Sequence, residues 1–257
     1  MREASERVPK PMVTIGERPI LWHVMKYFAH YGHTDFILCL GYKAEVIKDY
    51  FLNYSEALSN DFVLSDGGNR VDLLSHDIQE WRITFVQTGL HASIGERLRA
   101  VRAHLDAEEI FLANYGDVLT DAPLPLMVDN LMARDKVGSF LCVRPTYTVH
   151  VVTVDEQQVA RDIVDIMEAD VWINGGYFIF RNEIFDYIEE GEDLVHEPFR
   201  RLISAEQLLG YRYDGFWAPM DTLKDKQQLE ALAESGRAPW RVWENGDVHA
   251  EIEMGRR

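Results

Sequence analysis

The sequence predicts an α/β fold, a Rossmann-like and mostly parallel mixed sheet flanked by helices. Short apolar runs typical of buried strands alternate with longer segments whose apolar residues recur at helical spacing. Through the first half of the chain these segments follow one another in strand–helix–strand order, which is typical of parallel sheets. The length of 257 residues is enough for one domain with a full hydrophobic core.

The first expected helix covers residues 19–32 and ends at Gly32, because a glycine commonly follows the last turn. Further helices are expected at residues 44–54, 95–105, 124–136, 182–191, 197–210 and 222–236. Strands are expected at residues 36–42, 82–88, 109–117, 137–145, 149–155, 172–180 and within 210–222.

The chain is expected to form a single domain over residues 1–244. No Pro/Gly/Ser-rich linker, low-complexity segment or internal repeat divides it. Residues 245–257 are charged and are expected to form a loose tail.

The composition excludes several function classes. The net charge of −17, from 26 basic and 43 acidic side chains, repels nucleic-acid phosphates, so no nucleic-acid partner is expected. No apolar run approaches the roughly 20 residues that a membrane-spanning helix needs, and the charged N-terminus is unlike a signal peptide. Cys39 and Cys142 lie inside apolar runs, which favours buried, reduced thiols and the cytoplasm.

Three segments are candidates for chemistry, because ligands bind at the carboxyl ends of the strands in parallel α/β sheets. Lys10 lies between Pro9 and Pro11, which restrict its backbone and present its ammonium group to a phosphate. Asp117 and Asp221 each follow an apolar strand, where two carboxylates can hold Mg²⁺. Each residue also has a plainer explanation: a surface lysine in a rigid loop, a turn aspartate and a helix N-cap.

The order of these segments resembles the sugar-phosphate nucleotidyltransferases, and among them the glucose-1-phosphate cytidylyltransferases. The resemblance covers roughly residues 9–244. It is carried by PKPMVTIGERPILWHVMKYFAHYG, FILCLGYKAEVIKDYF, NYGDVLTD, WINGGYFIF, GFWAPMDTLKDKQQLE and APWRVWE. The PKPM block is shared broadly, whereas the ILWH, PMDT and APW blocks point to the cytidylyl branch.

The resemblance implies transfer of a nucleotidyl group from CTP to a sugar 1-phosphate, with Mg²⁺ as cofactor. It implies that Lys10 contacts phosphate, and that Asp117 and Asp221 hold the metal. It also implies a set of binding residues: Arg97, Gly116 and Asp117 at the nucleotide, and Glu168, Asn174, Gly175 and Gly176 at the sugar. Relatives assemble into oligomers, so a homo-oligomer is expected.

The sequence departs from the family pattern in two places. The glycine-rich GGxGTR loop, its arginine and the first strand of the sheet are absent, and a misplaced start codon is the preferred explanation. The chain as written is therefore expected to bind CTP weakly and to turn over poorly or not at all. The segments that meet the sugar phosphate in many relatives are replaced around Glu168 and by residues 145–150. There His150 could face the sugar phosphate, but a lone histidine beside a strand is more often structural.

Two alternatives stay open at this stage. One is a nucleotidyltransferase that uses another nucleotide or another sugar, because the departures affect the parts that read base and sugar. The other is a non-catalytic subunit that senses sugar nucleotides or serves as a scaffold. Two aligned metal-binding acids are of no use to a scaffold, which favours the enzyme.

Overall fold

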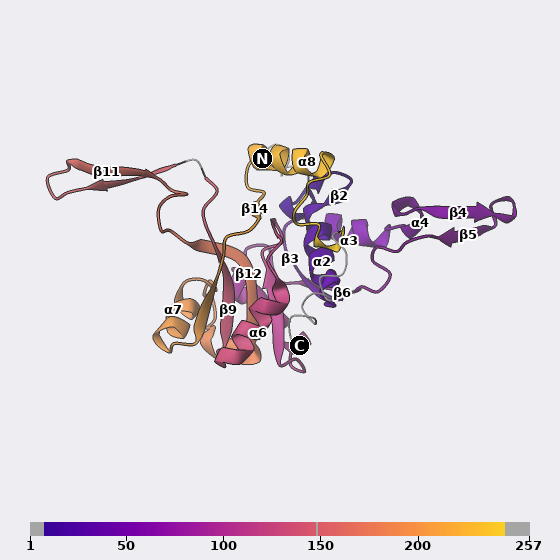
Figure 1. Ribbon diagram of the computed structural model, residues 1–257. Coiled ribbons are helices and arrows are strands. Elements are labelled where there is room, and N and C mark those ends of the chain that lie inside the picture. The colour runs from indigo at the N-terminus through magenta and orange to yellow at the C-terminus, as the bar shows by residue number, and fades with distance from the viewer. Residues whose placement is uncertain (1–7, 148, 245–257) are drawn as a thin grey trace, which may run out of the picture.

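The largest sheet of the computed structural model has four strands and lies at the centre of the molecule (Figure 1). The structure describes residues 8–147 and 149–244. β13 runs parallel to β9, and β12 runs antiparallel to both of its neighbours. The sheet is therefore mixed, in the order β13 (Leu208–Tyr213), β9 (Gly138–Val143), β12 (Ile173–Arg181) and β7 (Ile110–Asn114).

A second sheet contains β3 (Asp35–Leu40) and β6 (Arg82–Gln87), which pair in parallel. Within the described ranges β3 pairs only with β6, and β7 pairs only with β12. Each of these strands thus keeps one edge that no described strand covers. Ile37 of β3 and Ala113 of β7 nevertheless pack against the same hydrophobic cluster, so the two sheets share a core.

Helices cover the sheets and connect their strands. α6 contacts β9 and β12, α7 contacts β13, and α5 contacts β3. The helices are α2 (Ile20–His30), α3 (Ala44–Leu52), α4 (Glu56–Ser59), α5 (Ile94–Val101), α6 (Leu124–Arg134), α7 (Glu197–Ser204) and α8 (Leu223–Glu234). Short 3₁₀ segments are η1 (Lys10–Met12), η2 (Asp66–Gly68), η3 (Arg102–His104), η4 (Asn182–Tyr187) and η5 (Val242–Glu244). None of the helices in the part of the chain that the structure describes has the length and apolar character needed to cross a membrane.

The largest hydrophobic cluster joins the two ends of the described chain. It includes Val13, the inner face of α2 and α6, and Trp240 with Val242 near the end. Tyr27 of α2 is 1% exposed and donates its hydroxyl to the carbonyl of Ala122 over 2.7 Å. The C-terminal segment therefore belongs to the same core as the segment that carries Lys10.

Two small antiparallel pairs lie beside this core. β1 (Thr14–Ile15) pairs with β2 (Arg18–Pro19) directly before α2. β8 (Val118–Thr120) pairs with β14 (Trp217–Pro219), which precedes α8. These pairs connect segments that lie far apart in the sequence.

Two hairpins project from opposite sides of the body in Figure 1. One consists of β4 (Phe62–Ser65) and β5 (Arg70–Leu73), and the other of β10 (His150–Val154) and β11 (Ala160–Asp165). Both expose apolar side chains, among them Leu64 at 58% and Ile163 at 65%.

The predicted fold class is confirmed, and so are most of the predicted elements. Two helix predictions were wrong. Residues 182–191 contain only the 3₁₀ segment η4, and the helix predicted for 197–210 ends at Ser204, after which Glu206 takes a left-handed φ of 53° and β13 begins. A left-handed residue ends a right-handed helix, so the apolar residues that follow join the sheet. Residues 1–7 and the predicted tail, 245–257, lie outside the described residues.

Candidate active site

Lys10 lies between the carboxylates of Asp117 and Asp221. Its Nζ donates to Oδ2 of Asp117 over 2.6 Å and also forms an ion pair with Oδ1 of Asp221. These partners are 107 and 211 residues away in the sequence. The three residues that the strand-end pattern singled out therefore form one cluster.

The segment around Lys10 is held by its own short helix. Pro9 has an extended backbone with φ −65°, and its carbonyl accepts from the amide of Met12 over 2.8 Å. The carbonyl of Lys10 accepts from Val13 over 3.1 Å. Proline on both sides of Lys10 lowers the backbone entropy lost on folding, so the lysine starts from a restricted backbone.

Asp117 follows β7 through a tight turn. Asn114 accepts a hydrogen bond from the amide of Gly116 over 2.6 Å through its side-chain oxygen, and Gly116 has a φ of 83°. A Cβ on Gly116 would lie 3.9 Å from the ring of Pro11, so the turn packs beside the Lys10 segment. The chain then enters β8, which shows that Asp117 is not a helix N-cap.

Asp221 directly precedes the residue that caps α8. Thr222 is the N-cap: its hydroxyl accepts from the amide of Asp225 over 3.1 Å, and Asp225 accepts in return from Thr222 over 2.7 Å. This reciprocal arrangement satisfies the first free amides of the helix. The carboxylate of Asp221 is therefore not used in capping, and it points to Lys10 instead.

Burial and charge act in opposite directions on these groups. Burial raises the pKa of Asp117, the hydrogen bond and charge of Lys10 lower it, and the charge of Asp221 raises it again, so the pKa ends above its usual value. Burial lowers the pKa of Lys10, but its hydrogen bonds and ion pairs with the two aspartates raise it further, and the pKa ends above its usual value.

The two carboxylates fit a magnesium ion. A single cationic group, the ammonium of Lys10, already contacts both of them, so both oxygens reach one cation. Mg²⁺ is commonly held by one or two carboxylates together with substrate phosphates and water. Among the described residues no group of three or more Asp, Glu, His or Cys side chains has metal-binding geometry. Asp117 and Asp221 are thus suited to a metal that arrives with a nucleotide.

The segment of Asn174, Gly175 and Gly176 packs against the turn that carries Asp117. The side-chain amide of Asn174 donates to the hydroxyl of Tyr115 over 2.8 Å. Gly176 has a φ of 74°, and a Cβ there would lie 2.8 Å from the ring of Tyr115. The indole of Trp217 donates to the carbonyl of Gly175 over 2.8 Å. Only glycine permits this close approach, so the expected sugar residues lie beside the Asp117 turn.

Arg97 lies at the carboxyl ends of β3 and β6. From α5 its Nη1 donates to the hydroxyl of Thr88 over 2.8 Å, and its guanidinium fills the space beside Gly41. Parallel strands end here, which agrees with a place near a nucleotide. Among the described residues no ion pair joins Arg97 to an acidic group.

Comparison with known proteins identifies the family of this chain. No protein-family model matches the sequence. A glucose-1-phosphate cytidylyltransferase of Salmonella typhi is 37% identical over 238 residues, which are 92% of each chain. A protein of Bacillus subtilis strain 168, named a probable glucose-1-phosphate cytidylyltransferase, is 33% identical over 95% of each chain.

The chain belongs to the glucose-1-phosphate cytidylyltransferase family. The fold agrees with this assignment. The structure of an apo UDP-glucose pyrophosphorylase superposes with a TM-score of 0.68, covering 92% of this chain and 94% of the other at 14% identity. At that identity the likeness shows the shared fold alone.

Two sugar candidates of this cytidylyltransferase-family chain lie away from the cluster. Glu168 is exposed in the turn after β11, where its amide donates to the carbonyl of Asp165 over 2.9 Å. His150 is exposed at the start of β10. Nothing described brings either side chain to Lys10, so their sugar contacts stay predictions.

Sequence reasoning missed two tyrosines at the cytidylyltransferase-family site. Tyr115 connects Asn174 to the Asp117 turn, as described above. Tyr147, in the segment that replaces the family pattern, has its pKa raised by burial and by the charges of Asp221 and Asp225, against the charge of Lys10. Tyr147 is 44% exposed, and the charges of the cluster act on it. The unusual sequence of residues 145–150 was the available signal.

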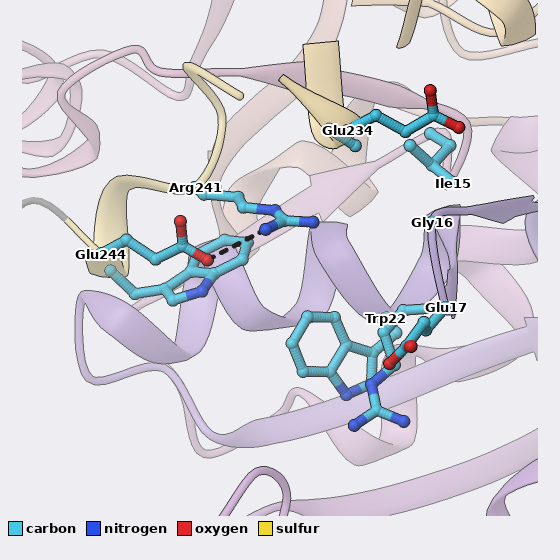
Figure 2. A pocket seen from close by; sticks show the side chains of 10 residues that line it. Ile15, Gly16, Glu17, Trp22, Glu234, Arg241 and Glu244 are labelled. Carbon is cyan, nitrogen blue, oxygen red and sulfur yellow. Dashed lines mark hydrogen bonds and ion pairs between the residues drawn. The ribbon is translucent and has the colours of Figure 1, made fainter. Parts of the chain in front are cut away.

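A separate hollow of about 360 Å³ lies elsewhere on this family member (Figure 2). Its walls come from the β1–β2 turn, α2, the end of α8 and the C-terminal segment, where Arg241 donates to Glu244 over 3.2 Å. Lys10, Asp117 and Asp221 do not line it. The hollow is thus distinct from the candidate active site.

Proposed function

We propose that the protein transfers the cytidylyl group of CTP to glucose 1-phosphate, giving CDP-glucose and pyrophosphate. The observation that carries this proposal is the Lys10 ammonium shared by Asp117 and Asp221 in a chain that is 37% identical to a glucose-1-phosphate cytidylyltransferase. The cluster offers one cation for phosphate and two carboxylates for a metal, which is the set that nucleotidyl transfer requires.

The reaction exchanges one phosphorus–oxygen bond for another. A phosphate oxygen of the sugar 1-phosphate attacks the α-phosphorus of CTP, and the bond from that phosphorus to the bridging oxygen of the β-phosphate breaks. The electron pair leaves with pyrophosphate. The attacking phosphate is already an anion, so no side chain has to remove a proton, and catalysis depends on positioning and charge neutralisation.

Asp117 and Asp221 are the residues that would hold Mg²⁺, which neutralises charge on the triphosphate when it is bound. Lys10 reaches both carboxylates, so its ammonium is close enough to donate to phosphate oxygens at the same place. The paired prolines limit the movement of its backbone. The raised pKa of Lys10 keeps the ammonium charged at neutral pH.

The sugar is proposed to bind beside the Asp117 turn. Asn174 already orients its amide on Tyr115, and the glycines after it leave backbone room. Arg97, at the carboxyl end of β3, is proposed to meet the nucleotide together with Gly116. These roles follow from the family resemblance and from the positions described above.

Pyrophosphate release tests the proposal. The chain, and a form extended by its upstream codons, are supplied with Mg²⁺ and glucose 1-phosphate and with CTP, UTP, dTTP, ATP or GTP in turn. We expect CTP to be used. Use of another nucleotide at a higher rate would assign a different specificity, and a folded protein that releases no pyrophosphate in either form would contradict the enzyme.

A homo-oligomer and a cytoplasmic location complete the proposal. Exposed apolar residues on both hairpins, such as Leu64 and Ile163, support association with further copies of the chain, since a lone two-stranded hairpin is marginally stable. Free thiols at Cys39 and Cys142 support a reducing compartment. Light scattering after gel filtration tests the first point: a mass above 29.7 kDa is expected, and a monomer at assay concentration would contradict it.

A further inference from the structure

One peptide group, between Ile15 and Gly16, is held from two sides. Its carbonyl accepts a hydrogen bond from Nε2 of His23 over 3.1 Å. Its amide donates to Oε1 of Glu230 over 2.9 Å. The described peptide bonds are all trans, so the carbonyl and the amide point in opposite directions and the two side chains grip the group from opposite sides.

His23 can form both of its hydrogen bonds in only one tautomer. It is 1% exposed on α2, and the indole of Trp240 approaches its Nδ1 at 3.4 Å. An indole nitrogen can only donate, so Nδ1 accepts and the ring proton lies on Nε2. Nε2 then donates to Ile15. The C-terminal segment thereby fixes which nitrogen of His23 faces the peptide.

Glu230 is held in turn from α8. Its Oε2 accepts from Nζ of Lys226 over 2.7 Å, one helical turn earlier, while Oε1 faces Gly16. Gly16 has a φ of 60°, in the left-handed region that favours glycine, and it turns β1 into β2. Figure 2 shows Ile15 and Gly16 between Glu234 of α8 and Trp22 of α2.

The Ile15–Gly16 peptide connects the segment that carries Lys10 to the helix that follows Asp221. Lys10 lies five residues before Ile15, on the segment that leads into β1, and Asp221 lies immediately before the cap of α8. The segment from Lys10 to Gly16 is therefore joined to the region of α8 at two points. Lys10 forms an ion pair with Asp221 at the start of the helix, and Gly16 forms a hydrogen bond with Glu230 farther along it.

We propose that His23 and Glu230 are positioning residues for the transfer reaction, because they clamp the Ile15–Gly16 peptide and so set the place of Lys10 relative to Asp221. This inference rests on the proposed function. Transfer depends on placing charged groups within a fraction of an ångström, so release of the clamp lowers turnover more than substrate binding. The described hydrogen bonds of His23 and Glu230 go to Ile15, Gly16, Lys226 and Trp240, and none goes to Lys10, Asp117 or Asp221.

Substitutions of Glu230 test the clamp on a partly exposed side chain. Glu230→Ala removes the acceptor of the Gly16 amide, whereas Glu230→Gln keeps an oxygen there and loses only the charge. Lys226→Ala is the matched control, because it removes the ion pair and leaves Glu230. Two quantities are measured: hydrogen exchange of the Gly16 amide, and kcat with KM for both substrates in the form of the chain that releases pyrophosphate.

We expect Glu230→Ala to speed Gly16 exchange about tenfold and to lower kcat about tenfold with little change in KM. Glu230→Gln and Lys226→Ala should stay within about twofold of the unmodified protein, because partly exposed ion pairs four residues apart on a helix contribute little. Unchanged kcat and exchange in Glu230→Ala would overturn the proposal, and so would a Glu230→Gln variant as slow as Glu230→Ala.

His23 provides the second arm. His23→Gln keeps a donor close to the Nε2 position, and His23→Phe keeps a ring but loses both nitrogens, so Gln is expected to retain more of kcat than Phe at equal folded fraction. The reverse order would contradict the clamp. If neither form of the unmodified protein releases pyrophosphate, the proposed function fails, while Gly16 exchange still decides the clamp.

Discussion

The backbone amide of Met220 donates to the carbonyl of Asp117 over 3.0 Å. This hydrogen bond continues the antiparallel pairing of Val118 with Pro219 by one step. It places the residue before Asp221 against Asp117 itself, so the spacing of the two carboxylates is set by the backbone. The chemistry of the cluster thus follows from a strand pairing, and each part of it can be tested separately.

Lys10→Met is expected to lower kcat for pyrophosphate release by about a hundredfold to a thousandfold, because it removes a charged donor at the phosphates. Lys10→Arg should retain part of the activity, since the charge remains with a different shape. Lys224→Met, an exposed lysine on α8, is the control. Equal activity of Lys10→Met and the control would contradict a role for Lys10.

Asp221→Asn is expected to raise the Mg²⁺ concentration for half-maximal activity at least about tenfold, because it removes one anionic ligand. Asp225→Asn is the matched comparison, since Asp225 accepts from the backbone amides of Asp221 and Thr222 at the start of α8 and not from Lys10. It should lower the free energy of unfolding by about 1 kcal/mol and leave the Mg²⁺ dependence alone. Mg²⁺ titrations and denaturant unfolding measure both. If Asp225→Asn raised the Mg²⁺ requirement and Asp221→Asn did not, the metal would bind elsewhere.

Gly176→Ala is expected to destabilise the protein more than Gly191→Ala. Both glycines have left-handed φ values, 74° and 80°, so both alanines are strained. An added Cβ at Gly176 meets Tyr115 at 2.8 Å, whereas the space beside Gly191 is open. The difference in free energy of unfolding should be about 1–3 kcal/mol. Equal losses of unfolding free energy in the two variants would show that the turn moves to accommodate the added Cβ without cost.

Asn174→Ala and Glu168→Ala separate the predicted sugar residues. Asn174 lies beside the Asp117 turn, and Glu168 is exposed beyond β11. We expect Asn174→Ala to raise KM for glucose 1-phosphate about tenfold through loss of a hydrogen-bonding group. A comparable rise of this KM in Glu168→Ala would show that the β10–β11 hairpin and the turn that carries Glu168 move to the sugar. An unchanged KM for glucose 1-phosphate in Asn174→Ala would show that Asn174 does not bind the sugar.

Stability should depend on pH through His23. Burial lowers its pKa from 6.5 to about 4, so between these values the unfolded chain binds a proton that the folded protein does not. Stability from this group is therefore full above pH 6.5, falls as the pH decreases, and levels off near pH 4, by about 3 kcal/mol in all. Denaturant unfolding at several pH values should show this slope in the unmodified protein. His23→Phe should lack it, and an identical slope in both proteins would contradict the shift.

The sequence allowed the candidate cluster to be predicted, because strand-end acids and a proline-flanked lysine have recognisable local patterns. It did not reveal that Thr222 rather than Asp221 caps α8, since both residues are good caps and only the folded geometry decides. The sequence likewise did not predict the left-handed backbone of Glu206, and for this reason it did not predict where β13 begins. Local propensity yields to tertiary context at such points.

The clamp could not be predicted from local pattern. His23 lies on the buried face of a helix, where a histidine is most simply explained as part of the core, and its partner Trp240 is 217 residues away. Glu230 belongs to an ordinary pair with Lys226 four residues earlier. Only the fold shows that both side chains reach one peptide group.

The most direct test of the central claim is pyrophosphate release from CTP and glucose 1-phosphate by the chain and its upstream-extended form, each compared with Lys10→Met and Asp221→Asn. We predict release that requires CTP and Mg²⁺, and a large loss in both variants. A folded protein that releases no pyrophosphate in either form, or whose release is unchanged in both variants, would contradict it.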